Sequence, residues 1–143
     1  MSAENKELIR RAVEEIQNQG KLEAVDRYYA PDWVLHDAPP NRGDREGFKK
    51  MVETIRGGFP DVHTRIDMIL AEGDLVATYW TSEGTHTREY FGVPPSDKTV
   101  RLTGISINRI NEGKIVESWM ESRGQGFHYQ LTGKPAPVEA AAR

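Results

Sequence analysis

Apolar residues recur three or four positions apart through the first sixty residues, which is the spacing of one helix face. The first such stripe comprises Leu8, Ile9, Ala12, Val13 and Ile16. Ser2 is a suitable N-cap for this helix, and Gly20 is a suitable stop. A second short helix ends at Pro31, and a third begins after Asp44. Their apolar positions are Leu22, Val25 and Tyr29, and then Phe48, Met51, Val52 and Ile55.

Beyond residue 60 the period changes to two, as in β-strands. One face of the first long strand is expected to carry Val62, Thr64, Ile66, Met68 and Leu70. Turns at Glu72-Gly73-Asp74 and Asn111-Glu112-Gly113 predict antiparallel pairing. The remaining extended segments are 33–36, 75–85, 98–110 and 114–123, with a short helix at 126–131. Helices followed by strands predict an α+β fold, in which three N-terminal helices pack on a curved, mainly antiparallel sheet that encloses a pocket.

Two strands of this sheet are not patterned like dry core strands. Thr78, Trp80, Ser82 and His86 share one side of strand 75–85, so this strand is expected to border solvent or a pocket. Strand 98–110 has Leu102 on one face and Ile105 and Ile107 on the other. Helices cover only one face of a sheet, so we expect a second subunit on the other, in a homodimer or larger homo-oligomer.

Composition narrows the function classes. The 143 residues carry a net charge of −3 with no basic stripe, which argues against nucleic-acid binding. There is no cysteine, no apolar leader and no run of about 20 apolar residues, so we expect a cytoplasmic protein that does not enter the membrane. One domain is expected at 1–132, followed by a loose tail at 133–143.

Several segments together resemble one family. YYAPDWVLHDAPP, GFPDV, AEGDLVATYWTSEGTH, FGVPPSDKTVRLTG and NEGKIVESW are similar, in order and spacing, to the SnoaL-like polyketide cyclase (ester cyclase) family of the NTF2-like superfamily. The resemblance covers residues 5–132. It implies an α+β cone whose pocket uses neither cofactor nor metal, usually within a homo-oligomer. The cyclases of the family close a ring by intramolecular aldol condensation, with a pocket Asp transferring the proton.

The resemblance places that Asp four residues after the Trp of the GKI-x-E-x-W motif, where this chain has Arg123. An arginine stays protonated and cannot act as a general base. We therefore expect Glu121 or His36 to transfer protons, while Arg123 stabilises an oxyanion or binds an acidic group. The predicted pocket contains catalytic His36, Glu121 and Arg123, and substrate-binding Trp33, Tyr79, Trp80, His86 and Trp119.

The predicted activity is that of a cofactor-independent lyase, cyclase or isomerase acting on a small carbonyl compound. One alternative is a small-ligand-binding protein without catalysis. Another is an epoxide-hydrolase-like enzyme, since some members of this superfamily use an Asp–Arg–Asp set. Arg101 or Arg123 would supply the arginine of such a set. His36 and His86 also suit structural roles. Glu121 and Arg123 also suit an ion pair on the surface. No HExxH, GxGxxG, Walker or GxSxG motif occurs, so no metal, nucleotide cofactor or serine nucleophile is expected.

Overall fold

The computed structural model describes residues 2–38, 43–123 and 126–134. The helices are α1 (Ser2–Ala12), which continues as the π-helix η1 (Val13–Asn18), α2 (Glu23–Tyr28), α3 (Arg45–Gly58) and α4 (Gly126–Thr132). The strands are β1 (Tyr29–Leu35), β2 (His63–Glu72), β3 (Leu75–Thr85), β4 (Thr99–Asn111) and β5 (Lys114–Arg123). The predicted elements are therefore present, although Tyr29 begins β1 instead of closing α2. Residues 39–42 and most of the predicted tail, from residue 135 on, lie outside the described residues.

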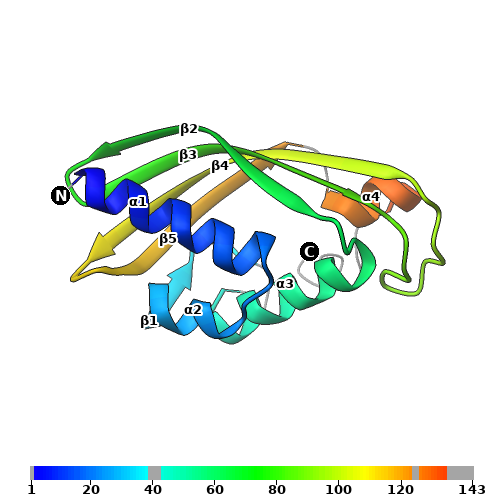
Figure 1. Ribbon diagram of the computed structural model, residues 1–143, viewed down its shortest axis with the longest axis horizontal. Helices are drawn as coiled ribbons and strands as arrows, with labels where there is room; N and C mark the ends of the chain where they lie inside the picture. The colour runs from blue at the N-terminus through cyan, green and yellow to red at the C-terminus, as the bar shows by residue number, and fades with distance from the viewer. Residues whose placement is uncertain (1, 39–42, 124–125, 135–143) are drawn as a thin grey trace.

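The five strands form one sheet in the order β1-β5-β4-β3-β2. β1 runs parallel to β5, and the other neighbours are antiparallel. Glu112 and Gly113 join β4 to β5 with φ angles of 51° and 75°, as a two-residue hairpin of type I′ requires. The four long strands form an arched layer above the helices, and β1 lies below it near α2 (Figure 1). The α+β prediction is confirmed.

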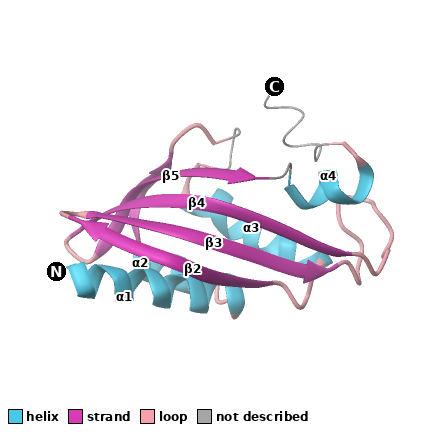
Figure 2. Ribbon diagram, turned by 90° about the horizontal axis from the view of Figure 1, so that it is seen from above, coloured by secondary structure: helices cyan, strands magenta, loops and turns pink. Residues whose placement is uncertain are grey.

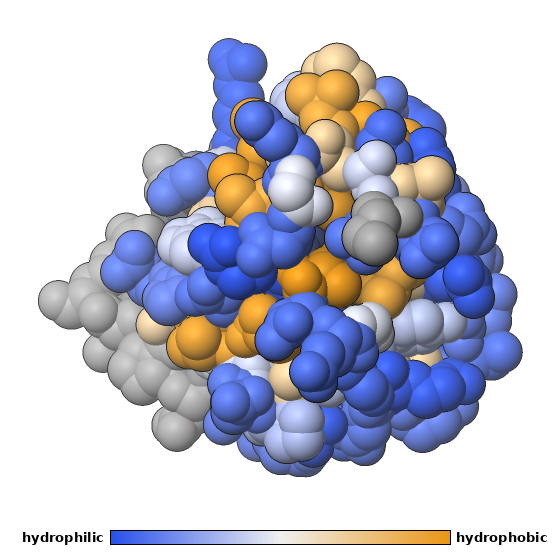
Figure 3. Space-filling model, turned by 90° about the vertical axis from the view of Figure 1, so that its left-hand side faces the viewer, coloured by the Kyte–Doolittle hydropathy of each residue, from blue (hydrophilic) through white to orange (hydrophobic). Residues whose placement is uncertain are grey.

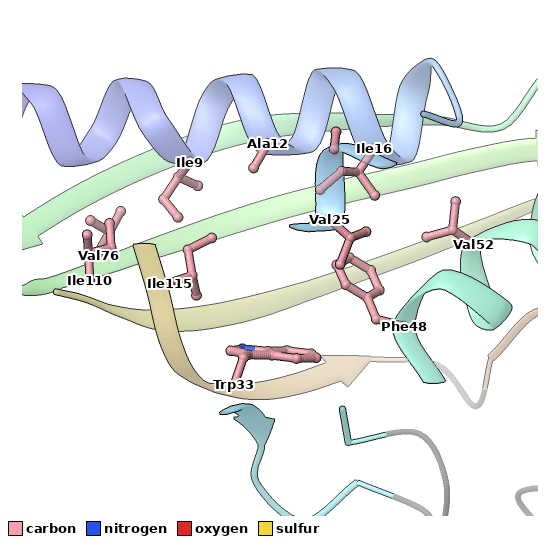
Figure 4. Packing of buried hydrophobic residues seen from close by; sticks show 11 residues of the cluster. Ile9, Ala12, Ile16, Val25, Trp33, Phe48, Val52, Val76, Ile110 and Ile115 are labelled. Carbon is pink, nitrogen blue, oxygen red and sulfur yellow. The ribbon is translucent and has the colours of Figure 1, made fainter. Parts of the chain in front are cut away.

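Among the described residues, helices cover only one face of this sheet, which we call the inner face; the opposite face is the outer face. Figure 2 shows the long strands in front of α1 and α3. The main core lies between α1 and the inner face, and includes Ile9, Ala12, Ile16, Val76, Ile110 and Ile115 (Figure 4). A second cluster, which joins α4 and the end of α3 to β4, contains Phe59, Val62, Tyr90, Val100 and Phe127.

Side-chain hydrogen bonds cap the start of α3 and hold the end of η1 against the sheet. The carboxylate of Asp44 accepts from the backbone N–H of Gly47 at 2.8 Å, so the predicted N-cap of α3 is confirmed. The side chain of Asn18 bonds both backbone groups of Thr64, accepting at 2.7 Å and donating at 3.0 Å. This pairing satisfies polar groups at the free edge of β2 and holds the end of η1 against it.

A β-bulge changes which side chains β2 turns outward. Ile66 pairs with Trp80 but Met68 pairs with Tyr79, so Asp67 is an extra residue in β2. One extra residue reverses the alternation. The expectation that Met68 and Leu70 share a face with Ile66 is therefore wrong. Their side chains lie on the outer face and are 61% and 70% exposed.

Candidate ligand-binding site

The register of β4 and β5 places the predicted catalytic carboxylate and arginine on the outer face. Glu121 pairs with Ile105, and Arg123 pairs with Thr103. Directly paired residues project to the same face, and Ile105 is 49% exposed on the side without helices. Glu117, Trp119, Glu121 and Arg123 do point the same way, as predicted. The expectation that this face lines the cavity is wrong.

The other predicted site residues divide between the two faces. Tyr79 pairs with Ile105, and the His36 ring stacks on Trp119 with centroids 4.9 Å apart, so all three aromatic side chains belong to the outer face. Trp33, Trp80 and His86 belong to the inner face. A single pocket ringed by all eight residues therefore does not form, because a strand presents alternate residues to opposite faces.

The inner face carries an aromatic wall, a name we give to the Trp80 indole together with Gly104 and Ser106 of β4. The indole of Trp80 donates through Nε1 to the hydroxyl of Ser106 at 2.9 Å. Its six-membered ring packs against Gly104, where an added Cβ would lie 2.4 Å from the Trp80 Cζ2 atom. Glycine at this position therefore gives the indole room to lie against the backbone of β4. Trp80 and Ser106 are both half-buried, so this part of the wall keeps accessible surface.

A second tryptophan on the inner face begins a series of buried hydrogen bonds in which each hydroxyl or N–H has a partner. The indole of Trp33 donates to the Ser118 hydroxyl at 2.9 Å, and that hydroxyl donates to the Asn108 side-chain oxygen at 2.5 Å. All three residues are buried. Trp33 also packs beside Tyr29 and Phe48, with ring centroids 4.8 and 5.7 Å away. Burial raises the pKa of the Tyr29 hydroxyl. Trp33 thus belongs to the packed core between the sheet and α3.

His86 is fully buried at the end of β3. Its Nδ1 atom is 2.8 Å from the Ser96 hydroxyl, and its backbone carbonyl accepts from the N–H groups of Ser96 and Asp97. Its ring lies 5.3 Å from that of Phe59. Its Nε2 atom has no hydrogen-bond partner among the residues that the structure describes. His86 therefore holds the segment that follows β3 against the second core cluster.

The described inner positions of β3, β4 and β5 carry no charged side chain. On β5 these positions include Ser118, Met120 and Ser122, which pair with Asn108, Ser106 and Gly104. The inner wall thus offers hydroxyl groups, an amide, an indole and a thioether. Such a surface suits a neutral, ring-bearing ligand better than a charged one, because a desolvated charge needs a partner.

A chain of ion pairs crosses one end of the outer face. The Arg109 guanidinium donates to both Asp74 oxygens at 2.8 and 2.9 Å and to Glu117 at 2.7 Å. Glu117 also bonds the His36 Nε2 at 2.8 Å. Hydrogen bonds from His36 and then Arg109 lower the pKa of the Glu117 carboxyl. The Arg109 guanidinium also lies 5.9 Å from the Trp119 ring.

Sequence reasoning missed Asp74, Arg109 and Glu117 as members of this cluster. The hairpin turn implies that Arg109 and Glu117 are near-opposite across β4 and β5, which is a usable signal. The pairing of His36 with this group depends on the parallel placement of β1 beside β5, which no local pattern reveals.

The structure supplies three further observations. A shallow polar depression of about 160 Å³ lies at the β2–β3 end of the sheet, lined by His63, Arg65, Thr81 and Glu83. Across the described ranges, no three histidine or acidic side chains are grouped to hold a metal ion. No helix in that part of the chain has the length and apolar character needed to span a membrane.

Comparison with known proteins gives consistent matches along nearly the whole chain. The profile of the SnoaL-like polyketide cyclases matches residues 7–131. Nogalonic acid methyl ester cyclase of Streptomyces nogalater is 30% identical over 131 residues, covering 88% of this chain and 96% of the relative.

Solved structures give the same result. A candidate polyketide cyclase from Acidithiobacillus ferrooxidans superposes with a TM-score of 0.79 at 28% identity, covering 93% of this chain and 97% of the other. AclR, a candidate hydroxylase from Streptomyces galilaeus, gives 0.79 at 27% identity, with coverage of 94% and 100%. IdmH, a candidate polyketide cyclase from Streptomyces antibioticus, gives 0.74 at 33% identity, with coverage of 89% and 97%. The predicted NTF2-like cone is confirmed.

Proposed function

Because the chain belongs to the SnoaL-like polyketide cyclase family, we propose that it binds a flat, polyketide-like carbonyl compound on the inner face and closes a ring in it without a cofactor. The observation that carries the proposal is the Trp80 indole, packed on Gly104 and half-exposed beside the Ser106 hydroxyl. An indole gives a flat apolar surface for a ring system. The uncharged wall around it suits a neutral ligand.

The proposed chemistry relies on positioning and on enolate stabilisation. In a polyketide-like compound, protons on a carbon between two carbonyl groups are acidic, so a solvent water molecule can remove one, and the alkoxide formed on ring closure takes a proton back from water. Holding the two reacting carbons together removes much of the entropic barrier to ring closure. A hydroxyl donor placed at the enolate oxygen stabilises the charge that develops there. These roles need no charged side chain on the inner strands.

A second candidate function is binding without turnover. It is favoured by the side chains of β5 that face inward, Ile115, Ser118, Met120 and Ser122, none of which is an acid or a base. A protein that stores, carries or senses the same kind of compound needs the aromatic wall but no proton-transfer group. The epoxide-hydrolase alternative gains nothing from the structure, since Arg101 lies exposed on the outer face 3.6 Å from Glu83.

One experiment separates these functions. Binding of anthraquinone-2-sulfonate, a soluble flat carbonyl compound, is measured by calorimetry, and nogalonic acid methyl ester is incubated with the protein and followed by mass-resolved chromatography. Binding together with a cyclised product of unchanged mass supports the cyclase proposal. Binding without conversion of this or related keto compounds supports the binding function. If the protein binds neither compound and converts neither, the cyclase function and the binding function are both rejected.

We also propose that the outer face packs against a second copy of this chain. Its centre is apolar, with Met68, Leu70, Tyr79, Ile105 and Ile107 all exposed in the single chain. Figure 3 shows hydrophobic side chains reaching the surface on the upper side of the view, where the outer face lies. Ion pairs flank this centre, including Arg109–Glu117 and Arg65–Asp67. A two-fold pairing can bury the apolar centre while leaving the charged groups paired.

A further inference from the structure

The inner face contains two tryptophan–serine pairs of the same geometry. Trp33 donates to Ser118, and Trp80 donates to Ser106, each at 2.9 Å. An indole N–H can only donate, so in both pairs the serine oxygen is the acceptor. Each serine hydroxyl therefore keeps its own hydrogen for a second hydrogen bond.

The two pairs differ in what that hydrogen does. The Ser118 hydroxyl donates to the Asn108 side chain, and both residues are buried. The Ser106 hydroxyl has no acceptor in the part of the chain that the structure describes. Ser106 and Trp80 are also half-buried, whereas Ser118 and Trp33 are each only 5% exposed. One pair is thus a closed structural element, and the other leaves a donor at an accessible wall.

The surroundings of Ser106 define what this donor can bind. The Trp80 indole lies on one side, packed on the backbone of Gly104. Across the strand pair lies Met120, which is 44% exposed. No charged side chain occupies the described inner positions of β3, β4 or β5. The site therefore combines an aromatic surface, a polarisable thioether and a single neutral donor.

We infer that Ser106 and Trp80 form a binding subsite for a carbonyl oxygen carried on a flat ring. The ring contacts the indole, and the carbonyl oxygen accepts from the Ser106 hydroxyl, whose orientation is set by the Trp80 N–H. A neutral acceptor matches a neutral donor, while a carboxylate or an amine would lose hydration without gaining a charged partner. The inference rests on the proposed function and specifies which group of the ligand the protein recognises.

The test compares two probes that share one ring system and one sulfonate. Anthraquinone-2-sulfonate has ring carbonyl groups, and anthracene-2-sulfonate has none. Affinities are measured by calorimetry, and the Trp80 indole N–H resonance, assigned from a Trp80→Phe spectrum, is followed by NMR. The wild-type protein should bind the quinone more tightly. Ser106→Ala should weaken quinone binding about threefold to tenfold, as expected for one neutral hydrogen bond, and leave anthracene-2-sulfonate binding unchanged.

Three variants control for indirect effects. Ser106→Thr keeps the hydroxyl and should retain the preference for the quinone. Ser118→Ala alters the equivalent but closed pair and should also retain it. Trp80→Phe should weaken binding of both probes. Retention of the quinone preference in Ser106→Ala, or an equal loss of that preference in Ser118→Ala, overturns this inference while leaving the proposed function standing. If neither probe binds the wild-type protein, the proposed function itself fails.

Discussion

The indole of Trp80 occupies the space in which any side chain at position 104 would begin. A Cβ built on Gly104 would lie 2.4 Å from the Trp80 Cζ2 atom and 2.9 Å from the backbone oxygen of Glu121. A ring and a backbone group cannot both move away cheaply. The glycine on β4 is therefore a requirement for the position of the aromatic wall, and through it for the Trp80–Ser106 hydrogen bond.

Gly104→Ala should therefore destabilise the protein and displace the indole. Overpacking of this kind costs about 1–3 kcal/mol, which exceeds the gain of about 0.5–1 kcal/mol from replacing a strand glycine. Urea denaturation measures the loss, and the Trp80 indole resonance reports the displacement. Gly57→Ala is the matched control, because an added Cβ there meets no atom of the described residues within 4 Å and the site is helical. Equal stability of the two variants would contradict this account of position 104.

Replacing an apolar residue at the centre of the outer face should break the proposed assembly. Ile107→Glu puts a charge on the face that we propose is covered by a second copy, and a buried unpaired charge is strongly unfavourable. Light scattering should change from the mass of two or more chains to the mass of one. Lys50→Glu, on an exposed position of α3, should leave the mass unchanged. A wild-type protein that is monomeric across micromolar concentrations would remove the basis for this prediction.

The Glu117 carboxylate should contribute stability that disappears in acid. Bonds from His36 and Arg109 lower its pKa in the folded state below the unfolded value of about 4.3. A carboxyl with a depressed folded pKa stabilises the protein above the unfolded pKa, and loses this contribution as the pH falls through the folded pKa. The difference in unfolding free energy between wild type and Glu117→Gln should therefore be largest near pH 6 and shrink toward pH 3.

Glu121→Gln is the control for this titration. Glu121 lies on the same strand and the same face, and has no ion pair or side-chain hydrogen bond in the described part of the chain. Its replacement should give a difference that varies little with pH. The role assigned to Glu117 is wrong if the two variants show the same pH dependence.

His86 should be a structural residue that orders the segment after β3. His86→Ala removes a buried ring and its bond to Ser96, so a loss of roughly 2–5 kcal/mol is expected, as for large core side chains. Ser96→Ala removes only the hydroxyl and should cost about 1 kcal/mol. Hydrogen exchange at the amide of Asp97, which donates to the His86 carbonyl at 2.9 Å, should accelerate more in His86→Ala. Unchanged exchange in that variant would argue against this role.

Local patterns along the chain determined the elements of the fold. Helical spacing in residues 8–16 and 48–55 identified α1 and α3, and Asp44 identified the start of α3. The period of two and the turns at Gly73 and Gly113 identified the antiparallel strands. These features depend on interactions between residues close in sequence, so the sequence alone was sufficient to predict them. The motif resemblance added the cone and the family, both of which the comparisons confirm.

Tertiary structure decided which face of each strand meets the helices. Alternation showed that Trp119, Glu121 and Arg123 share a direction, but not that their direction is outward. That outcome depends on the pairing of β5 with β4 and on the side from which the helices approach. The bulge at Asp67 likewise turned Met68 and Leu70 outward, and the parallel placement of β1 brought His36 to Glu117. The alternation of side chains is a property of a single strand, whereas the face that each side chain meets is a property of the assembled sheet. The candidate site could therefore be identified only in the folded chain.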